Sequence, residues 1–293
     1  RALKLAGHRV ITDNHIGDWG TQFGFVIYGY RHHLDRAAYE KDPIEELVRV
    51  YKKANDDAKT DEKVREAARE ELVKLQREDG ENRALWREFI AVSMREFEKV
   101  YARLGVTFDH VLGESFYNDM LKDVVEDLKR KGIATEDAGA WCVFIREPGF
   151  PDAPFIVQKS DGAFNYASTD LATIRYRVET FKADAALYVV GSPQADHFKQ
   201  LFHTARRWGH VDMELKHIEF GSVLGEDGKI LRTRGSDNVR LQDLLDEAEE
   251  RALRLVTELR PELDEATRKD IAAAVGIGAV KYADLMQNRT TDY

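Results

Sequence analysis

The stretch "ADAALYVVGSPQADHFKQLFHTARRWGHVDMELKHIEF" (residues 183–220) decides the fold. It opens with a short apolar run at 183–191, typical of a buried strand, and a second strand-like run begins at residue 213. Between them, residues 194–209 carry apolar side chains at the spacing of an amphipathic helix. A strand, a helix and a strand in this order predict parallel strands joined by a right-handed crossover.

The same alternation extends upstream of this stretch. Residues 140–147 and 154–161 look like a strand pair around the proline and glycine residues of "PGFPDAP" (148–154), and residues 169–181 have the pattern of a helix. Strands that alternate with helices indicate an α/β fold built on a parallel sheet.

The rest of the chain is mainly helical in pattern. Residues 8–14 are β-rich and lead into the turn-forming loop 15–24. Residues 34–104 are dense in Glu, Lys, Arg and Ala, with apolar residues at helical spacing, and the helical pattern resumes at 121–132 and again from Leu241. The charged helical faces most simply face solvent.

We therefore predict a Rossmann-like, nucleotide-binding parallel-sheet domain that is split by a helical insertion and followed by a helical segment. The expected parts are residues 1–30 (first part of the sheet domain), 31–150 (mainly helical insertion), 151–240 (second part) and 241–293 (helical segment).

Composition excludes several classes of protein. The chain has 293 residues, 43% of them hydrophobic, and no apolar run approaches the roughly 18 residues of a membrane helix. A single cysteine, Cys142, allows no intrachain disulfide and favours a reducing compartment such as the cytoplasm. The net charge of −9 argues against a generally basic nucleic-acid-binding coat, although a local basic face at 199–210 or 268–281 stays open. The start at Arg1, without Met, suggests a fragment.

Tyr166 and Asp170 form the first candidate binding pair. They lie four residues apart, one helical turn, where a strand-like run changes to a helix-like one. In doubly wound sheets, ligands bind where helix N-termini converge beyond the carboxyl ends of the strands. A carboxylate and a phenolic oxygen suit the planar guanidinium of arginine better than an ammonium. The alternative is structural: Ser168 or Thr169 caps the helix, with Asp170 in its first turn.

The turn after the first strand of the opening stretch and the loop after the second are further candidates. Gln194 can add an amide to a ligand or be an ordinary loop residue, and His197 can support a phosphate or simply begin a helix. Lys229, Arg232 and Arg234 lie among small residues, which suits a polyphosphate; the alternative is an exposed hairpin. The sequence has no protein-made metal site that spacing would support, so we expect only Mg²⁺ that arrives with a nucleotide.

Together these segments closely resemble the arginyl-tRNA synthetases, a family of class I aminoacyl-tRNA synthetases. The motifs follow the order of that family along the whole chain: "NHIGDWGTQFG", "FDHVLGESFYNDM", "VQKSDGAFNYASTDLATIRYR", "YVVGSPQADHF", "VLGEDGKILRTRGSDNVRLQDLLDEA" and "VGIGAVKYADLMQNRTTDY".

The resemblance implies a reaction and a set of site residues. ATP and L-arginine would give arginyl-adenylate and pyrophosphate, and the arginyl group would then pass to tRNA(Arg). The partners implied are therefore arginine, ATP and tRNA, and we expect a cytoplasmic monomer. The residues implied are Tyr166, Asp170 and Gln194 for arginine; His197, Gly221, Val223, Leu224 and Lys229 for ATP; and Arg232 and Arg234 for catalysis.

The chain also departs from the family pattern. The signature loop of the family usually has Lys-Thr-Arg, whereas this chain has Arg232, Thr233 and Arg234. The His-x-Gly-His signature is absent, so we expect an interior piece of a catalytic domain, cut before the anticodon-binding helices and inactive alone. Two alternatives stay open: a non-catalytic paralogue that binds arginine or tRNA, and another class I synthetase or nucleotidylyltransferase.

The resemblance also covers two motifs that carry less chemistry. "GDWGTQFG" resembles a loop that closes one side of the active site, where Asp18, Trp19 and Gln22 could be structural supports or ligands. In "GESFYNDM", Glu114 and Tyr117 are expected to be structural.

Overall fold

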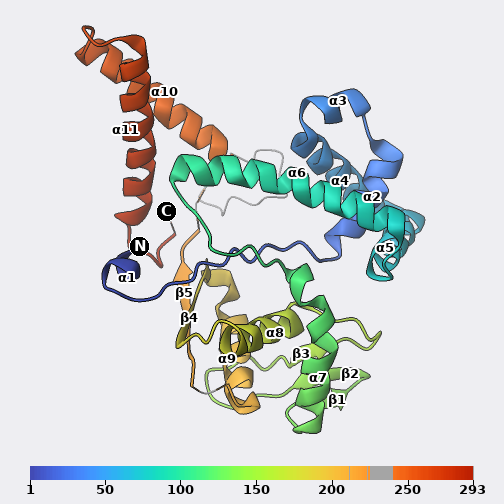
Figure 1. Ribbon diagram of the computed structural model, residues 1–293. Coiled ribbons are helices and arrows are strands. Elements are labelled where there is room, and N and C mark those ends of the chain that lie inside the picture. Colours follow the sequence, from blue (N-terminus) through green and yellow to red (C-terminus); the bar gives the residue numbers. More distant parts are fainter. Residues whose placement is uncertain (211, 223, 225–239, 293) are drawn as a thin grey trace. The chain divides into compact units, whose positions relative to one another are not determined.

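The structure is a computed structural model that describes residues 1–210, 212–222, 224 and 240–292. The chain divides into two compact units (Figure 1). The first comprises Arg1–Gly113 and Arg234–Val280, and the second comprises Glu114–Thr233 and Lys281–Tyr293. Each unit is therefore built from segments that are distant in sequence.

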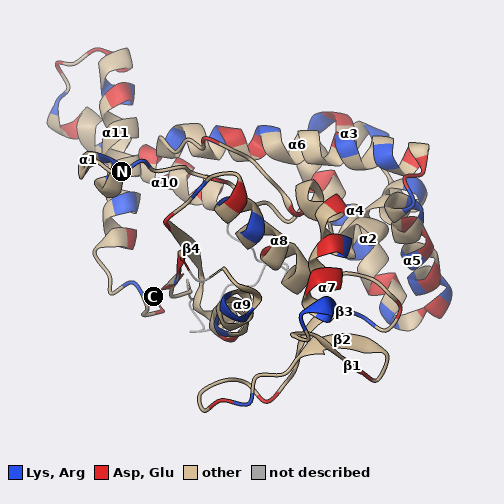
Figure 2. Ribbon diagram, turned by 60° about the horizontal axis from the view of Figure 1, so that its bottom comes forward, with Lys and Arg blue, Asp and Glu red and all other residues tan. Residues whose placement is uncertain are grey.

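Helices dominate the first unit. After the short α1 (Ala2–Leu5), the bounds of its next helices are α2 (Gln22–His33), α3 (Arg36–Lys41), α4 (Pro43–Thr60), α5 (Glu62–Gln76) and α6 (Gly80–Leu104). Their apolar faces form a buried cluster of Phe23, Ile27, Leu47, Leu75, Phe89 and Val92. Acidic and basic residues both occur along these helices (Figure 2). The prediction of a helical block at 34–104 is confirmed.

An aspartate caps the start of each helix from α3 to α6. The carboxylates of Asp35, Asp42, Asp61 and Asp79 accept backbone N–H groups from the first turns of these helices, at distances between 2.9 and 3.2 Å. Such caps satisfy N–H groups that have no partner inside the helix, which explains why the helices begin where they do.

Two further helices, α10 (Leu241–Leu259) and α11 (Glu265–Leu285), follow near the end of the chain. Arg103 at the end of α6 donates to Glu249 of α10 at 2.9 Å and lies 2.7 Å from Asp246. The predicted helical segment is thus confirmed, and these ion pairs connect it to α6.

The second unit contains the parallel strand pair. Strands β4 (Ala185–Gly191) and β5 (Glu214–Phe220) pair in parallel, in a register from Ala185 opposite Glu214 to Gly191 opposite Phe220. Helices α8 (Tyr166–Glu179) and α9 (Ala195–Trp208) accompany them, and α9 lies between the two strands in sequence, as predicted. The 3₁₀ helix η2 (Ser192–Gln194) connects β4 to α9.

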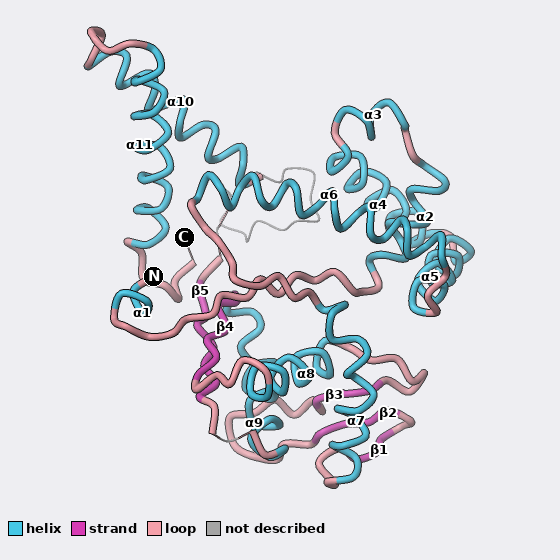
Figure 3. The backbone as a smooth tube through the Cα atoms, in the orientation of Figure 1, coloured by secondary structure: helices cyan, strands magenta, loops and turns pink. Residues whose placement is uncertain are grey.

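A second sheet is antiparallel. Its strands, in the order β1 (Thr135–Asp137), β2 (Ala140–Val143) and β3 (Phe155–Gln158), form a separate ribbon in Figure 3. The 3₁₀ helix η1 (Glu114–Met120) and α7 (Leu121–Arg130) precede it, and α7 ends before Gly132, whose φ of 64° is the predicted left-handed stop. The predicted strand pair is confirmed. The parallel sheet, however, contains only β4 and β5 among the described residues, because β3 pairs with β2 instead.

Two predictions near the N-terminus are wrong. The β-rich residues 8–14 form no strand; their backbone bonds to residues 109–110 include one isolated bridge, between Asp13 and His110. Side-chain bonds replace a ladder here, since Asp109 accepts the backbone N–H of Thr12 at 2.7 Å and its hydroxyl at 2.8 Å. The predicted loop 15–24 also ends early, because α2 begins at Gln22 and buries Phe23.

Among the described residues, no helix is both long enough and apolar enough to cross a membrane.

Candidate functional site

The start of α8 is fixed by a reciprocal cap. The Asn165 side chain accepts the Ala167 N–H at 3.1 Å, and the Ser168 hydroxyl accepts the Asn165 N–H at 3.2 Å. The N-cap is therefore Asn165 rather than Ser168 or Thr169, and Ser168 contributes the second bond of the cap from inside the helix. Asp170 lies beyond the first turn, so the helix start does not account for its presence.

Asp170 has its partner on a different helix. His197, in the first turn of α9, places its Nε2 atom 2.6 Å from Asp170 Oδ2. A carboxylate only accepts hydrogen bonds, so Nε2 must carry the proton. The two side chains are largely enclosed, with exposed fractions of 18% for Asp170 and 12% for His197.

Tyr166 completes this cluster. Its ring packs edge-on against the His197 ring, with centroids 4.8 Å apart, while 61% of the residue stays exposed. The predicted pair of Tyr166 and Asp170 thus lies together, and His197 joins it. The side chains of Tyr166, Asp170 and His197, which we call the Asp170 cluster, lie near the N-terminal ends of α8 and α9.

Asp170 has no Lys or Arg partner among the residues that the structure describes. The only polar partner recorded there for Asp170 is His197, and no Lys or Arg lies within ion-pairing distance. A mostly enclosed carboxylate is costly unless it is paired. The Asp170 cluster is therefore suited to a cationic ligand group.

The remaining predicted residues follow the two parallel strands. Gln194 is exposed at the N-cap of α9, three residues after β4 and three before His197. Ser192 donates its hydroxyl to the Phe220 carbonyl at 2.9 Å, which connects the chain just after β4 to the end of β5. Gln194 and the residues after Phe220 thus lie at the same edge of the sheet, as predicted.

Gly221 is held by the C-terminal segment of the chain, a contact that the sequence did not reveal. Its N–H donates to the Arg289 carbonyl at 2.8 Å, and the N–H of Ser222 donates to Asp292 at 2.6 Å. A β-carbon at Gly221 would lie 2.2 Å from the Thr291 carbonyl oxygen, so only glycine fits. Leu224 is half-buried. Val223, Lys229, Arg232 and Arg234 lie outside the described residues.

The "GDWGTQFG" segment contributes packing in the first unit. Asp18 is only 6% exposed, and its carbonyl accepts the indole N–H of Trp86 at 2.7 Å. The rings of Trp19 and Trp86 meet edge to face at 5.6 Å. In the second unit Tyr117 is fully buried, as expected for a structural residue.

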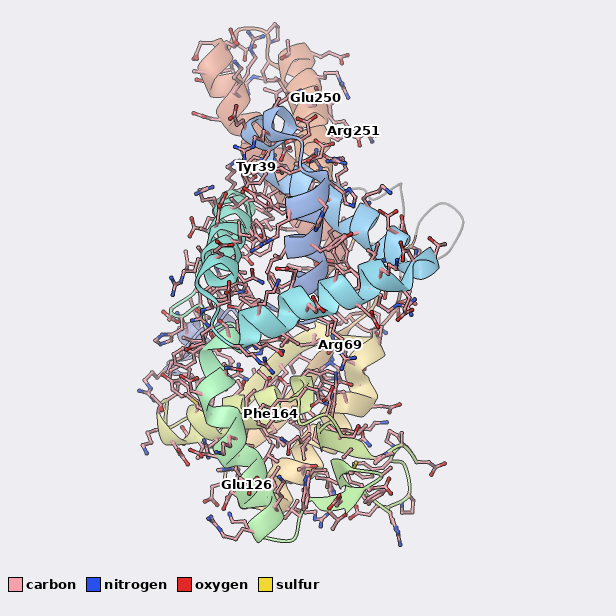
Figure 4. All side chains as sticks on the ribbon, turned by 90° about the vertical axis from the view of Figure 1, so that its right-hand side faces the viewer. Tyr39, Arg69, Glu126, Phe164, Glu250 and Arg251 are labelled. Atoms are coloured by element: carbon pink, nitrogen blue, oxygen red, sulfur yellow. The ribbon has the colours of Figure 1, made fainter. Side chains whose placement is uncertain are left out.

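A polar pocket of about 400 Å³ lies at the other end of α8. Its lining combines acidic, basic and aromatic residues, including Glu126 on α7 (Figure 4): Asp123, Glu126, Asp127, Arg130, Lys131, Arg175, Glu179, Trp208 and His210. Burial would raise the pKa of Asp127, but the Trp208 indole N–H, at 2.6 Å, and Lys131 outweigh it and lower that pKa. These internal bonds satisfy the Asp127 carboxylate.

No group of three or more His, Cys, Asp or Glu residues in the described part of the chain is arranged to hold a metal ion.

Comparison with known protein families identifies the class of protein. A family model described as "tRNA synthetases class I (R), catalytic domain" matches residues 1–293. The chain therefore belongs to the class I arginyl-tRNA synthetase catalytic-domain family.

Sequence identity to named relatives supports this membership. The chain is 47% identical over 292 residues to an arginine–tRNA ligase of Fusobacterium nucleatum, and 47% identical over 308 residues to one of Thermobifida fusca. Each match covers 100% of this chain, but only 51% and 52% of the relatives, so the chain spans about half their length.

Solved structures show the same fold. Arginyl-tRNA synthetase from Plasmodium falciparum matches with a TM-score of 0.78 and 29% identity, over 99% of this chain and 48% of that one. The Thermus thermophilus arginyl-tRNA synthetase matches with a TM-score of 0.79 at 22% identity, over 99% of this chain and 54% of that one, which concerns the fold alone.

Proposed function

We propose that this chain is part of an arginine–tRNA ligase. In the proposed reaction, the carboxylate of L-arginine attacks the α-phosphate of ATP, pyrophosphate leaves, and arginyl-adenylate forms. A hydroxyl of the terminal ribose of tRNA(Arg) then attacks the arginyl carbonyl and releases AMP. Membership of the family and the names of the relatives support this proposal.

The observation that carries the proposal is the enclosed position of Asp170 without a Lys or Arg partner. Its side chain is 18% exposed, and His197 is its one recorded polar partner within the described part of the chain. A guanidinium would supply a positive charge and could also donate to the Tyr166 hydroxyl and to the Gln194 amide oxygen. Citrulline, the neutral isostere, would leave Asp170 without its cation and should be rejected.

The nucleotide is assigned to the residues after β5. We propose that Gly221, Val223 and Leu224 lie against ATP and that Lys229 contacts its phosphates. Arg232 and Arg234 would neutralise the charge that develops as pyrophosphate leaves. This chemistry needs no protein base, because the attacking group is already a carboxylate, so positioning and charge account for it.

Further parts of the proposal concern the setting of the reaction. Mg²⁺ would enter with ATP, because substrate phosphates supply the oxygen ligands that this ion prefers. The protein would act as a monomer in the cytoplasm, where the lone buried thiol of Cys142 stays reduced.

The proposal is tested by exchange of labelled pyrophosphate into ATP with the complete natural polypeptide that carries this sequence. Arginine or citrulline is supplied, with and without tRNA(Arg). Exchange that requires arginine and is not supported by citrulline is the expected result. Arginine binding without any exchange, in a folded protein, would favour a non-catalytic paralogue instead.

A further inference from the structure

His197 holds one oxygen of Asp170. The 2.6 Å contact joins Nε2 to Oδ2, so a proton on Nε2 lies between the two side chains. The second oxygen, Oδ1, has no partner recorded among the described residues. The carboxylate is therefore fixed on one side and open on the other.

Three aromatic side chains hold the imidazole ring in this orientation. Its centroid lies 5.6 Å from that of Phe155 in β3, 4.8 Å from that of Tyr166 and 5.4 Å from that of the adjacent Phe198. Phe155 and Phe198 are themselves 3% and 4% exposed. A ring packed against buried neighbours from β3 and α9, and against the exposed Tyr166 ring from α8, has little freedom to turn, so the direction of its N–H is set before any ligand arrives.

The position of His197 also matters for charge. When the imidazole is neutral, it gives Asp170 a hydrogen bond and leaves the negative charge in place, whereas a lysine or arginine at this position would always cancel that charge. A neutral histidine thus orients Asp170 without cancelling the charge of its carboxylate.

We infer that His197 is a positioning residue for amino-acid recognition: it orients Asp170 so that Oδ1 faces the guanidinium group of the substrate. This inference rests on the proposed function and moves His197 from the nucleotide to the amino-acid side of the site. It makes His197 a determinant of the preference for arginine over citrulline.

The test uses two substitutions of His197 by residues whose side-chain amides differ in length. In His197→Gln the side-chain amide N–H can reach the position of Nε2, whereas in His197→Asn it falls short of Asp170. His203→Asn is the matched control, because His203 lies on the same helix with a side chain 17% exposed and packs on Phe150 instead. Pyrophosphate exchange by the complete polypeptide gives KM for arginine and for ATP separately, and melting temperatures verify folding.

We expect His197→Asn to raise KM for arginine by roughly 10-fold to 100-fold, with KM for ATP unchanged. His197→Gln should stay within roughly threefold of the unmodified protein, and so should His203→Asn. The preference for arginine over citrulline should fall in His197→Asn alone.

Two results would overturn the inference. One is a His197→Asn variant whose KM rises for ATP rather than arginine, which would return His197 to the nucleotide. The other is an equal loss in the Asn and Gln variants, which would mean that the N–H donor is irrelevant. Failure of the proposed function looks different, since the unmodified protein would then show no arginine-dependent exchange.

Discussion

A β-carbon at Gly29 of α2 would lie 2.4 Å from the carbonyl oxygen of Val50 in α4. The two helices approach so closely that a side chain at this position must displace backbone. Gly29→Ala should therefore lower the free energy of unfolding by roughly 1–3 kcal/mol, measured by denaturant titration.

The control for this substitution is Gly278→Ala in α11, where a β-carbon would meet nothing within 4 Å. There the higher helix propensity of alanine should stabilise the protein by roughly 0.5–1 kcal/mol. Equal effects at the two positions would show that close packing of α2 on α4 is not what Gly29 provides.

Asn82 joins three helices of the first unit. It is fully buried, its amide donates to the Glu71 carbonyl at 2.8 Å and to Glu71 Oε2 at 2.9 Å, and its oxygen accepts from Arg31 at 2.7 Å. Asn82→Ala would leave buried polar groups unpaired and should cost roughly 2–3 kcal/mol of stability. Arg87→Ala, at an exposed position on the same helix, should change stability by less than about 0.5 kcal/mol. A similar loss in both variants would contradict the role of the buried network.

His210 should make the protein sensitive to acid. Burial lowers the pKa of His210; Glu179 and Asp127 oppose this effect, and Lys131 and Arg175 add to it. Below about pH 6.5 the unfolded chain binds a proton at this residue that the folded chain does not, so the free energy of unfolding falls as pH falls. His210→Gln should therefore lose less stability than the unmodified protein between about pH 7.5 and pH 5.5.

This pH effect is measured by urea unfolding at the two pH values. His8→Gln provides the comparison, because His8 is exposed. If His210→Gln loses as much free energy of unfolding between the two pH values as the unmodified protein, the acid sensitivity arises from other residues.

Asp170→Asn should reduce the discrimination between arginine and citrulline by roughly 2–4 kcal/mol, because it removes one charge from an enclosed ion pair. The measurement is kcat/KM for the two substrates in pyrophosphate exchange. Asp196→Asn, whose side chain is 70% exposed on α9, should leave the ratio unchanged. Retained discrimination in Asp170→Asn would remove this residue from arginine recognition.

Local pattern was sufficient for most of the helices and for the parallel pair. Apolar spacing identified α4, α6 and α9, and the apolar runs identified β4 and β5. Pattern failed where partners decide the structure. The apolar residues at 8–14 look like a strand, but Asp109 takes the Thr12 N–H that a ladder would need.

The candidate site, too, could be predicted only in part from the sequence. Tyr166 and Asp170 could be paired from sequence because helical geometry places residues four apart on one face. The contact between His197 and Asp170 could not, since it depends on how α8 and α9 pack. No local signal in "RTTDY" indicated that Arg289 and Asp292 would bind the residues after β5.

That last contact has a consequence for the order of folding. Ser222 and Asp292 are separated by 70 positions in the chain, and α10 and α11 lie between them. Closing so long a loop costs entropy that only later contacts repay. During synthesis on the ribosome, β5 leaves the exit tunnel well before Asp292. The hydrogen bonds that hold the end of β5 therefore form only after Arg289 and Asp292 have been made.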